Sequence, residues 1–242
     1  MKCMIFAAGR GTRLRPLTDH MPKALVSVGT QTLLEHTLRK LMDAGATEVV
    51  VNVHHFREQI IRFLTTKDWG IPIQVSDERD ELLDTGGGLR HAAQLFTQDS
   101  RPVLIHNVDI LSNANLQALY ADSLNHDATL LVSSRPTQRY LLFDDNLHLK
   151  GRLNTTTGEV HSPEPNLQVD KYHKLAFAGI HCFAPRLFSL MKDFPQKFSI
   201  IDFYLSICNQ IDIQGCLQPS LQILDVGKPD TLRTATAFLR KV

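Results

Sequence analysis

Residues 3–18 read CMIFAAGRGTRLRPLT, an apolar run followed by a turn with two glycines and three arginines. The run Cys3–Ala7 has the length and composition of a buried β-strand, and Gly9 and Gly11 lie just after it. Small residues at the end of a buried strand let main-chain N–H groups approach a phosphate closely. The arginines, together with Lys23, supply positive charge for a polyanion. This stretch therefore predicts a strand followed by a phosphate-binding loop.

Two better-known phosphate-binding loops do not fit the same stretch. A dinucleotide fingerprint requires a third glycine at position 14, where this chain has Leu14. A P-loop requires the pattern GxxxxGK[ST], and no such string occurs in the chain. Dinucleotide-dependent oxidoreductases and P-loop proteins are therefore excluded, and a solvated basic loop without a ligand is the remaining alternative.

Beyond the loop, apolar runs of strand length alternate with segments of helical period as far as about residue 135. We expect further strands at 49–53, 71–75, 102–105 and 128–133, and helices at 32–44, 56–64, 89–96 and 116–124. Thr32 and Glu35 predict a capping box for the first of these helices. Crossovers of this length are typical of βαβ units. The fold class is therefore α/β, with a mainly parallel, Rossmann-like mixed sheet and helices on both faces.

After about residue 135 the pattern changes to shorter strands around polar turns. We expect strands at 140–143, 147–149, 174–183 and 221–226, a loop at 154–166, and helices at 200–208 and from Pro229 onward. No internal repeat or low-complexity linker separates this part from the first. We therefore expect one domain, residues 1–242, with the later part as a lobe on the same sheet.

The composition is that of a globular protein with a net charge close to zero. Of 242 residues 43% are apolar and 21% charged, and 26 Lys+Arg against 25 Asp+Glu leave a charge of +1. Neither nucleic acid nor an anionic membrane is therefore an expected partner. The apolar runs are far below the ~20 residues of a membrane span, and we see no signal peptide. Cys3, Cys182, Cys208 and Cys216 form no C-x-x-C pair, so we expect buried thiols in a reducing, cytoplasmic compartment.

Two aspartates follow apolar strands, where ligands of such sheets bind. Asp109 lies in Asn107-Val108-Asp109 and Asp225 in Leu224-Asp225-Val226-Gly227. Carboxylates at strand ends are what Mg²⁺ needs to bridge phosphate oxygens. Either one alone could be a turn or helix-cap residue. With the phosphate-binding loop at the same sheet edge, we expect Asp109 and Asp225 to hold Mg²⁺.

The strings AAGRGTRLRPLT at 7–18 and PKAL at 22–25 resemble the signature of the sugar-1-phosphate nucleotidyltransferases. LDTGGG at 83–88, FAGI at 177–180 and DVG at 225–227 extend the resemblance, which is strongest to the short bacterial N-acetylmuramate-1-phosphate uridylyltransferases. It implies a nucleotide-diphospho-sugar transferase fold and Mg²⁺-dependent transfer of a nucleoside monophosphate from an NTP to a sugar 1-phosphate. UTP, N-acetylmuramate 1-phosphate and a role in peptidoglycan recycling are favoured.

The resemblance also implies roles for individual residues. Arg13 and Lys23 are the catalytic pair: Arg13 would hold the β- and γ-phosphates, and Lys23 would lie against the α-phosphate and the incoming sugar phosphate. The sugar phosphate is already ionised, so charge neutralisation rather than a general base is required. The residues expected to wrap the nucleotide are Ala8, Gly9, Gly11 and Thr12.

Two further groups are implied for the base and the sugar. Thr85, Gly86 and Gly87 would read the base and ribose from a loop just before a helix, although glycine could also serve packing there. Asn107 and Gly179 would face the sugar, although Gly179 could also be a bulge glycine. In this interpretation residues 1–135 bind the nucleotide and residues 136–242 the sugar.

Two departures from the family pattern stand out. Val108 occupies a position that is usually glycine, which puts the geometry around the metal or sugar in question. The sugar-phosphate lysine of a Glu-Lys-Pro string is missing, because the stretch reads Ser162-Pro163-Glu164-Pro165. Lys171 and Lys174 are weak substitutes.

Several alternatives remain open. A guanylyltransferase for heptose or mannose 1-phosphate and a cytidylyltransferase for phosphocholine share the same signature, because main-chain groups distinguish bases poorly. A regulatory subunit that binds nucleotide sugars without catalysis is disfavoured by the presence of Arg13, Lys23, Asp109 and Asp225. We expect a monomer or homodimer.

Overall fold

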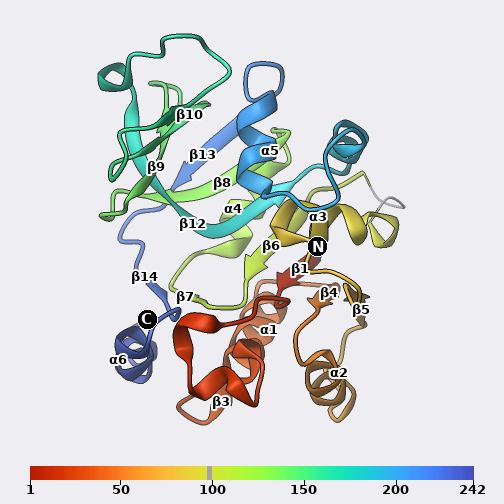
Figure 1. Ribbon diagram of the computed structural model, residues 1–242. Helices are drawn as coiled ribbons and strands as arrows, with labels where there is room; N and C mark the ends of the chain where they lie inside the picture. The colour runs from red at the N-terminus through yellow and green to blue at the C-terminus, as the bar shows by residue number, and fades with distance from the viewer. Residues whose placement is uncertain (97–99) are drawn as a thin grey trace.

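The computed structural model describes residues 1–96 and 100–242 and is built around one mixed, twisted sheet (Figure 1). In this part of the chain the sheet has ten strands, with β11-β10-β9-β12-β6-β1-β4-β5 as the main order and β8 and β13 branching from β12. Its strands are β1 (Lys2–Phe6), β4 (Glu48–Val53), β5 (Ile73–Asp77), β6 (Val103–Asn107), β8 (Ala128–Ser133), β9 (Arg139–Phe143), β10 (Leu149–Asn154), β11 (Val160–His161), β12 (His173–Phe183) and β13 (Ile213–Leu217).

The first part of the sheet is parallel, as predicted. β1 lies between β4 and β6, and β5 pairs with β4, all in parallel register. The long strand β12 then pairs antiparallel with β6, β8 and β9, and β9, β10 and β11 continue antiparallel into the lobe. The α/β fold class with a mixed sheet is thereby confirmed.

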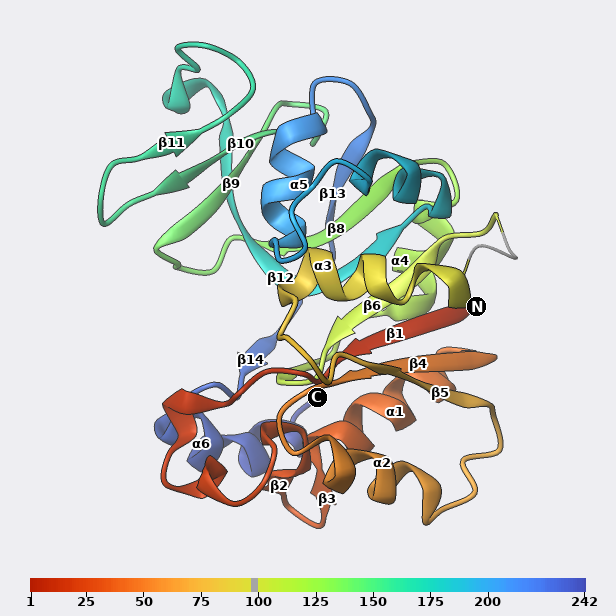
Figure 2. The same cartoon turned by 45° about the vertical axis from the view of Figure 1, so that its right-hand side comes forward.

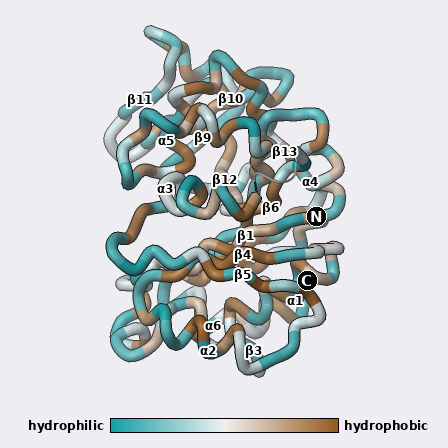
Figure 3. Tube along the Cα trace, turned by 90° about the vertical axis from the view of Figure 1, so that its right-hand side faces the viewer, coloured by the Kyte–Doolittle hydropathy of each residue, from teal (hydrophilic) through white to brown (hydrophobic). Residues whose placement is uncertain are grey.

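Helices cover both faces of the sheet (Figure 2). They are α1 (Leu33–Asp43), α2 (Arg57–Thr65), α3 (Asp84–His91), α4 (Leu116–Ser123), α5 (Ile200–Ile207) and α6 (Pro229–Leu239). The side chains of β1 alternate between two cores: Cys3 and Ile5 pack on the side of α1 and α2, and Met4 on the side of α3 and α5. Figure 3 shows the apolar central strands enclosed by more polar helices and loops.

The start of α1 was predicted in part. The Thr32 hydroxyl accepts a 3.1 Å hydrogen bond from the Glu35 main-chain N–H, which is one half of a capping box. The Glu35 carboxylate does not reach back to Thr32, because it forms ion pairs with Arg39 and Lys67. The helix is therefore capped by a single side chain.

The position of α3 differs from the prediction. We expected its helix to begin after Gly88, whereas it begins at Asp84, a residue with φ of 63°. Thr85, Gly86 and Gly87 are consequently part of the first helical turns rather than of a preceding loop.

The chain also contains short strands that the sequence pattern did not indicate. β13 runs parallel to β8, and β7 (Ile110–Ser112) pairs with β14 (Ile223–Asp225), which lies within the strand predicted at 221–226, as a separate short ladder. Another short ladder joins β2 (Ser27–Val28) to β3 (Gln31–Thr32). The expected loop at 154–166 contains β11. These strands are short, so they carry little periodic signal.

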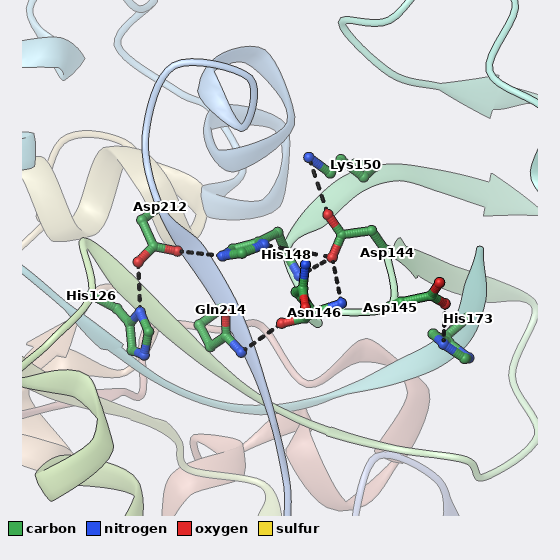
Figure 4. A network of polar contacts seen from close by, with 9 residues as sticks. All are labelled: His126, Asp144, Asp145, Asn146, His148, Lys150, His173, Asp212 and Gln214. Carbon is green, nitrogen blue, oxygen red and sulfur yellow. Dashed lines mark hydrogen bonds and ion pairs between the residues drawn. The ribbon is translucent and has the colours of Figure 1, made fainter. Parts of the chain in front are cut away.

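A polar network ties the turn between β9 and β10 to β13 (Figure 4). Asp144 accepts a hydrogen bond from the main-chain N–H of His148 at 2.9 Å, and Gln214 donates to the carbonyl of Asn146 at 3.0 Å. Asp212, just before β13, accepts a hydrogen bond from His126 Nδ1 at 2.6 Å. The lobe is thereby attached to the sheet through side chains as well as through β12.

Cys3, Cys182 and Cys208 are buried free thiols and Cys216 is half-buried, in agreement with the expectation that cysteine packs as a small apolar residue here. Of the helices in the described residues, none has the combined length and apolarity that crossing a bilayer requires.

Candidate active site

The predicted phosphate-binding loop and Asp109 line one cleft beyond the carboxyl ends of β1 and β6, and Gly227, two residues after Asp225, lines it as well. A cavity of about 280 Å³ lies there, and its lining includes Ala7, Gly9, Arg10, Gly11, Thr12, Arg13, Lys23, Val108, Asp109 and Gly227. The loop after β1, the end of β6 and the segment after β14 thus contribute to a single pocket, which is the crevice that the topology predicts.

The two glycines of the loop serve different purposes. Gly11 has φ of 65°, and a Cβ there would lie 2.9 Å from Lys23 Cβ, so the fold of the loop requires glycine. Thr18 fixes this turn by donating from Oγ1 to the Gly11 carbonyl at 2.8 Å. A Cβ at Gly9 would meet no protein atom within 4 Å. Gly9 therefore leaves space for a ligand in the cleft.

Positive charge in the loop is available to a ligand. Arg13 and Arg10 are exposed and have no hydrogen-bond or ion-pair partner among residues 1–96 and 100–242, whereas Arg15 pairs with Asp19. Arg13 reaches across the cleft, since its Nη2 would lie 2.8 Å from a Cβ built on Gly227. Glycine at 227 therefore allows the Arg13 guanidinium to approach the segment that carries Asp225.

Lys23 and Asp109 form a buried ion pair between the loop and the end of β6. The Lys23 side chain is 10% exposed and that of Asp109 21%. The main-chain carbonyl of Asp109 also accepts a 2.8 Å hydrogen bond from the N–H of Val226. The ammonium group is thus held at the cleft by the Asp109 carboxylate, and a substrate phosphate could take the place of that carboxylate.

Asp225 lies beside Asp109, although the two are far apart in the chain. It ends β14, where it is paired with Ile110, the residue that follows Asp109. Desolvation raises the pKa of Asp225 above its usual value, and the Asp109 carboxylate raises it further. The charges that oppose this shift come from Lys23, Arg13 and Arg135.

This pair of carboxylates fits a Mg²⁺ site whose remaining ligands come from the substrates. Two nearby carboxylates repel each other, and a divalent cation between them would relieve that repulsion. Mg²⁺ is commonly bound by one or two carboxylates together with substrate phosphates and water. Within the described part of the chain no three or more His, Cys, Asp or Glu side chains are grouped to hold a metal ion. Asp109 and Asp225 would therefore need the phosphates to complete the coordination.

The expected base-reading residues have protein partners. The N–H groups of Gly86 and Gly87 both donate to the carbonyl of Phe198, at 2.9 and 3.2 Å. A Cβ on Gly86 would lie 2.4 Å from the Phe198 ring, and the Thr85 hydroxyl accepts a hydrogen bond from Ile200 N–H at 2.9 Å. Close packing against the segment before α5 thus explains these residue types, and their contact with a base stays a prediction.

Asn52 and Glu78 form a buried relay that the sequence analysis missed. Asn52 Oδ1 accepts hydrogen bonds from the N–H groups of Ala7 and Ala8, at 2.7 and 3.3 Å. Its Nδ2 donates to Glu78 Oε1 at 2.7 Å, and Glu78 Oε2 accepts from the N–H of Leu83 at 3.0 Å. Burial raises the pKa of Glu78. The relay joins the start of the phosphate-binding loop to the start of α3.

Asn107 and Gly179 lie side by side on β6 and β12. Gly179 has φ of 75° at an irregularity in the pairing of β12 with β8, so it is a bulge glycine. A Cβ there would also lie 2.9 Å from Asn107 Nδ2. The bulge that was considered for Gly179 is therefore present, and its contact with the sugar stays a prediction.

Val108, at the position where glycine is usual in the resemblance, lies inside the cleft wall. It is 5% exposed and packs with the core beneath α1. Its carbonyl accepts a weak 3.4 Å hydrogen bond from Thr37. The β-branched side chain of Val108 therefore packs mainly within the core.

A second cavity of about 390 Å³ adjoins the first through Arg10. Its other lining residues are His54, Asp80, Glu81, Leu82 and Lys197. His54 is fixed by a 2.8 Å hydrogen bond between its Nδ1 and the carbonyl of Glu78. Polar and charged groups therefore continue from the phosphate-binding loop toward the ends of β4 and β5.

Comparison with known proteins identifies the family of this chain. Residues 2–143 match the model of the family described as nucleotidyl transferase. The N-acetylmuramate alpha-1-phosphate uridylyltransferase of Caulobacter vibrioides is 31% identical over 98% of this chain and 96% of its own. The mannose-1-phosphate guanyltransferase of Neurospora crassa is 35% identical over 98% of this chain, which spans 64% of that protein.

A solved structure has the same fold. HddC from Yersinia pseudotuberculosis, crystallised in complex with GMP-PN, superposes with a TM-score of 0.76 over 98% of this chain and 99% of its own, at 18% identity. With the cleft, the family match and a relative of nearly equal length, this chain belongs to the nucleotidyl transferase family of enzymes.

Proposed function

We propose that this enzyme transfers a nucleoside monophosphate from an NTP to a sugar 1-phosphate, with UTP and N-acetylmuramate 1-phosphate as the favoured pair. The observation that carries the proposal is the cleft in which the loop Gly9–Arg13 faces the Lys23–Asp109 ion pair and Asp225. The uridylyltransferase of Caulobacter vibrioides, which matches over 98% of this chain and 96% of its own, supports the choice of substrates.

In the proposed reaction an oxygen of the sugar phosphate attacks the α-phosphorus of the NTP. The bond from that phosphorus to the bridging oxygen breaks, and pyrophosphate leaves. The attacking oxygen is already anionic, so the enzyme's task is to neutralise charge and align two phosphates. No proton has to be removed for the attack.

The residues of the cleft divide this task. Arg13, whose guanidinium has no partner among the described residues, would bind the β- and γ-phosphates. Lys23 would exchange its ion pair with Asp109 for contacts to the α-phosphate and the sugar phosphate. Asp109 and Asp225 would hold Mg²⁺, which supplies further neutralisation of the phosphates.

The nucleotide and the sugar would lie on opposite sides of this centre. The loop residues Ala8, Gly9, Gly11 and Thr12 would wrap the phosphates, and the base would lie near Arg10 and the first turn of α3 with Thr85, Gly86 and Gly87. The sugar would lie against Asn107 and Gly179. Residues 1–135 would thus bind the nucleotide and 136–242 the sugar.

A guanylyltransferase acting on a mannose-type 1-phosphate is the second candidate. It is favoured by the 35% identity to the Neurospora crassa guanyltransferase and by the fold shared with HddC, which was crystallised with GMP-PN.

The test is pyrophosphate release with Mg²⁺ over a grid of four NTPs and a panel of sugar 1-phosphates that includes N-acetylmuramate, mannose and N-acetylglucosamine 1-phosphate. A maximum at UTP with N-acetylmuramate 1-phosphate supports the favoured pair, and a maximum at GTP with mannose 1-phosphate supports the second candidate. An Asp225→Asn variant is the inactive control. No pyrophosphate in any cell, with NTP binding intact, contradicts both.

A further inference from the structure

Arg135 lies at the junction between the sheet and the lobe, in the segment between β8 and β9. Its Nη2 donates a 3.0 Å hydrogen bond to the carbonyl of Phe177, two residues before Gly179 on β12. The side chain is half-buried, and it contributes to the positive field at Asp225. Arg135 is therefore a cation that is bonded to the strand carrying Gly179 and acts electrostatically on Asp225.

The protein does not use all of this guanidinium. Arginine has five N–H donors in a planar fork, and that fork matches phosphate and carboxylate geometry. Nε of Arg135 is enclosed and has no acceptor within the described residues. A buried donor without an acceptor costs free energy, and an anionic ligand that accepted this hydrogen bond would remove that cost.

The lysines considered for the sugar side cannot supply this charge. Lys174 is five residues before Gly179 on β12, roughly 16 Å along a strand at about 3.3 Å per residue, and its ammonium group pairs with Asp170. Lys171 precedes the strand and is exposed. Among the cations considered, Arg135 alone is bonded to the segment next to Gly179.

We infer that Arg135 binds an anionic group of the sugar 1-phosphate, and so replaces the lysine that the chain lacks at Ser162–Pro165. The inference rests on the proposed function. The anion is either the 1-phosphate itself or a carboxylate on the sugar ring, since the guanidinium fork binds both.

The experiment compares Arg135→Met with the wild type and with Arg62→Met, which removes an exposed arginine from α2 on the other part of the molecule. Steady-state kinetics would be measured with the preferred NTP. We expect Arg135→Met to raise KM for the sugar 1-phosphate about 10- to 100-fold, as for loss of a charged hydrogen bond, with the Kd of the NTP changed less than threefold. Arg62→Met should change neither, and Arg135→Lys should recover part of the loss.

Two sugars distinguish the anions. An equal loss for N-acetylmuramate and N-acetylglucosamine 1-phosphates identifies the phosphate, and a loss confined to N-acetylmuramate 1-phosphate identifies the carboxylate of its lactyl substituent. An unchanged KM for both, or an equal loss of NTP affinity, overturns the inference and leaves the proposed function standing.

If the wild type releases no pyrophosphate, the proposed function fails by itself. Calorimetric titration of the two sugar 1-phosphates into wild type and Arg135→Met then tests Arg135 directly. Weaker binding by the variant supports its role, and equal binding or none by both proteins rejects it. Thermal unfolding of each variant shows whether it is folded.

Discussion

The side-chain amide of Asn52 donates a 2.7 Å hydrogen bond to the carboxylate of Glu78, and both residues are 3% exposed. Parallel pairing of β4 with β1 sets Asn52 beside Phe6, so its Oδ1 reaches the N–H groups of Ala7 and Ala8. One buried amide therefore positions the first residues of the phosphate-binding loop. Asn52 and Glu78 act through the loop rather than on a substrate.

Replacing Asn52 by Leu should destabilise the protein and impair nucleotide binding. The change leaves two main-chain N–H groups and one oxygen of the buried Glu78 carboxylate without partners, at about 1–3 kcal/mol for each group. We expect the free energy of unfolding in urea to fall by roughly 3–5 kcal/mol and the Kd for NTP to rise. Asn209→Leu, at an exposed asparagine, is the control. An Asn52→Leu protein of wild-type stability would show that the relay is dispensable.

The variants Gly9→Ala and Gly11→Ala should have different effects, the first on NTP binding and the second on the stability of the fold. At Gly9 the added methyl group meets no protein atom within 4 Å and points into the space for the ligand, so we expect weaker NTP binding at nearly unchanged stability. At Gly11 the left-handed backbone and the contact with Lys23 should cost about 1–3 kcal/mol of stability. Calorimetric Kd values and urea unfolding measure the two effects, and the reverse pattern would contradict the assignment.

Lys23→Met should lower turnover more than it weakens NTP binding. The ammonium group is expected to contact both phosphates in the transition state, and loss of one such contact costs roughly 10²–10³ in rate. The ratio of kcat between wild type and variant, measured beside the NTP Kd, checks this. Lys192→Met, at an exposed lysine, should retain full activity. A loss below tenfold in Lys23→Met rejects the catalytic role.

Asp225→Asn should abolish Mg²⁺-dependent turnover without loss of stability. Desolvation and Asp109 raise the pKa of Asp225 in the folded protein, so its ionised form is less favourable there than in the unfolded chain, and at neutral pH this lowers stability. The neutral amide removes that cost, and we expect a Tm equal to or above that of the wild type. Asp230→Asn on α6 should leave turnover unchanged. Wild-type rates in Asp225→Asn would disprove the metal site.

Stability should fall as the pH decreases below about 6.5. Burial lowers the pKa of His106 to about 4 and of His181 to about 3, so both are neutral when folded, whereas the unfolded chain takes up protons below pH 6.5. Each histidine then costs up to about 1.4 kcal/mol per pH unit until its folded pKa is reached. Urea unfolding from pH 8 to 5 would measure this slope. His181→Leu should reduce it, and an unchanged slope would contradict the buried neutral state.

Much of the fold was predictable because its signals are local. An apolar run such as Cys3–Ala7 forms a buried strand by its own composition, and the alternation of strands and helices up to residue 135 requires a parallel sheet. The turn at Gly11 and the position of Asp109, two residues after the end of β6, follow from the same patterns. β7 has only three residues, and β13 contains a glutamine and a glycine, so neither shows a clear apolar pattern. The glycines at 86–88 conceal the start of α3 at Asp84, a residue with positive φ.

The local sequence pattern thus determined which candidate site residues follow which strands. A loop rich in glycine and arginine follows the first strand, one aspartate follows a later strand, and another aspartate follows a strand near the end of the chain. Only the tertiary structure brought Asp225 beside Asp109, gave the N–H groups of Gly86 and Gly87 to Phe198, and set Arg135 against Phe177. Periodicity and turn chemistry act over a few neighbouring residues. Contacts between segments about 40 to 120 residues apart depend instead on how the sheet orders and registers its strands, and no short stretch of sequence contains that information.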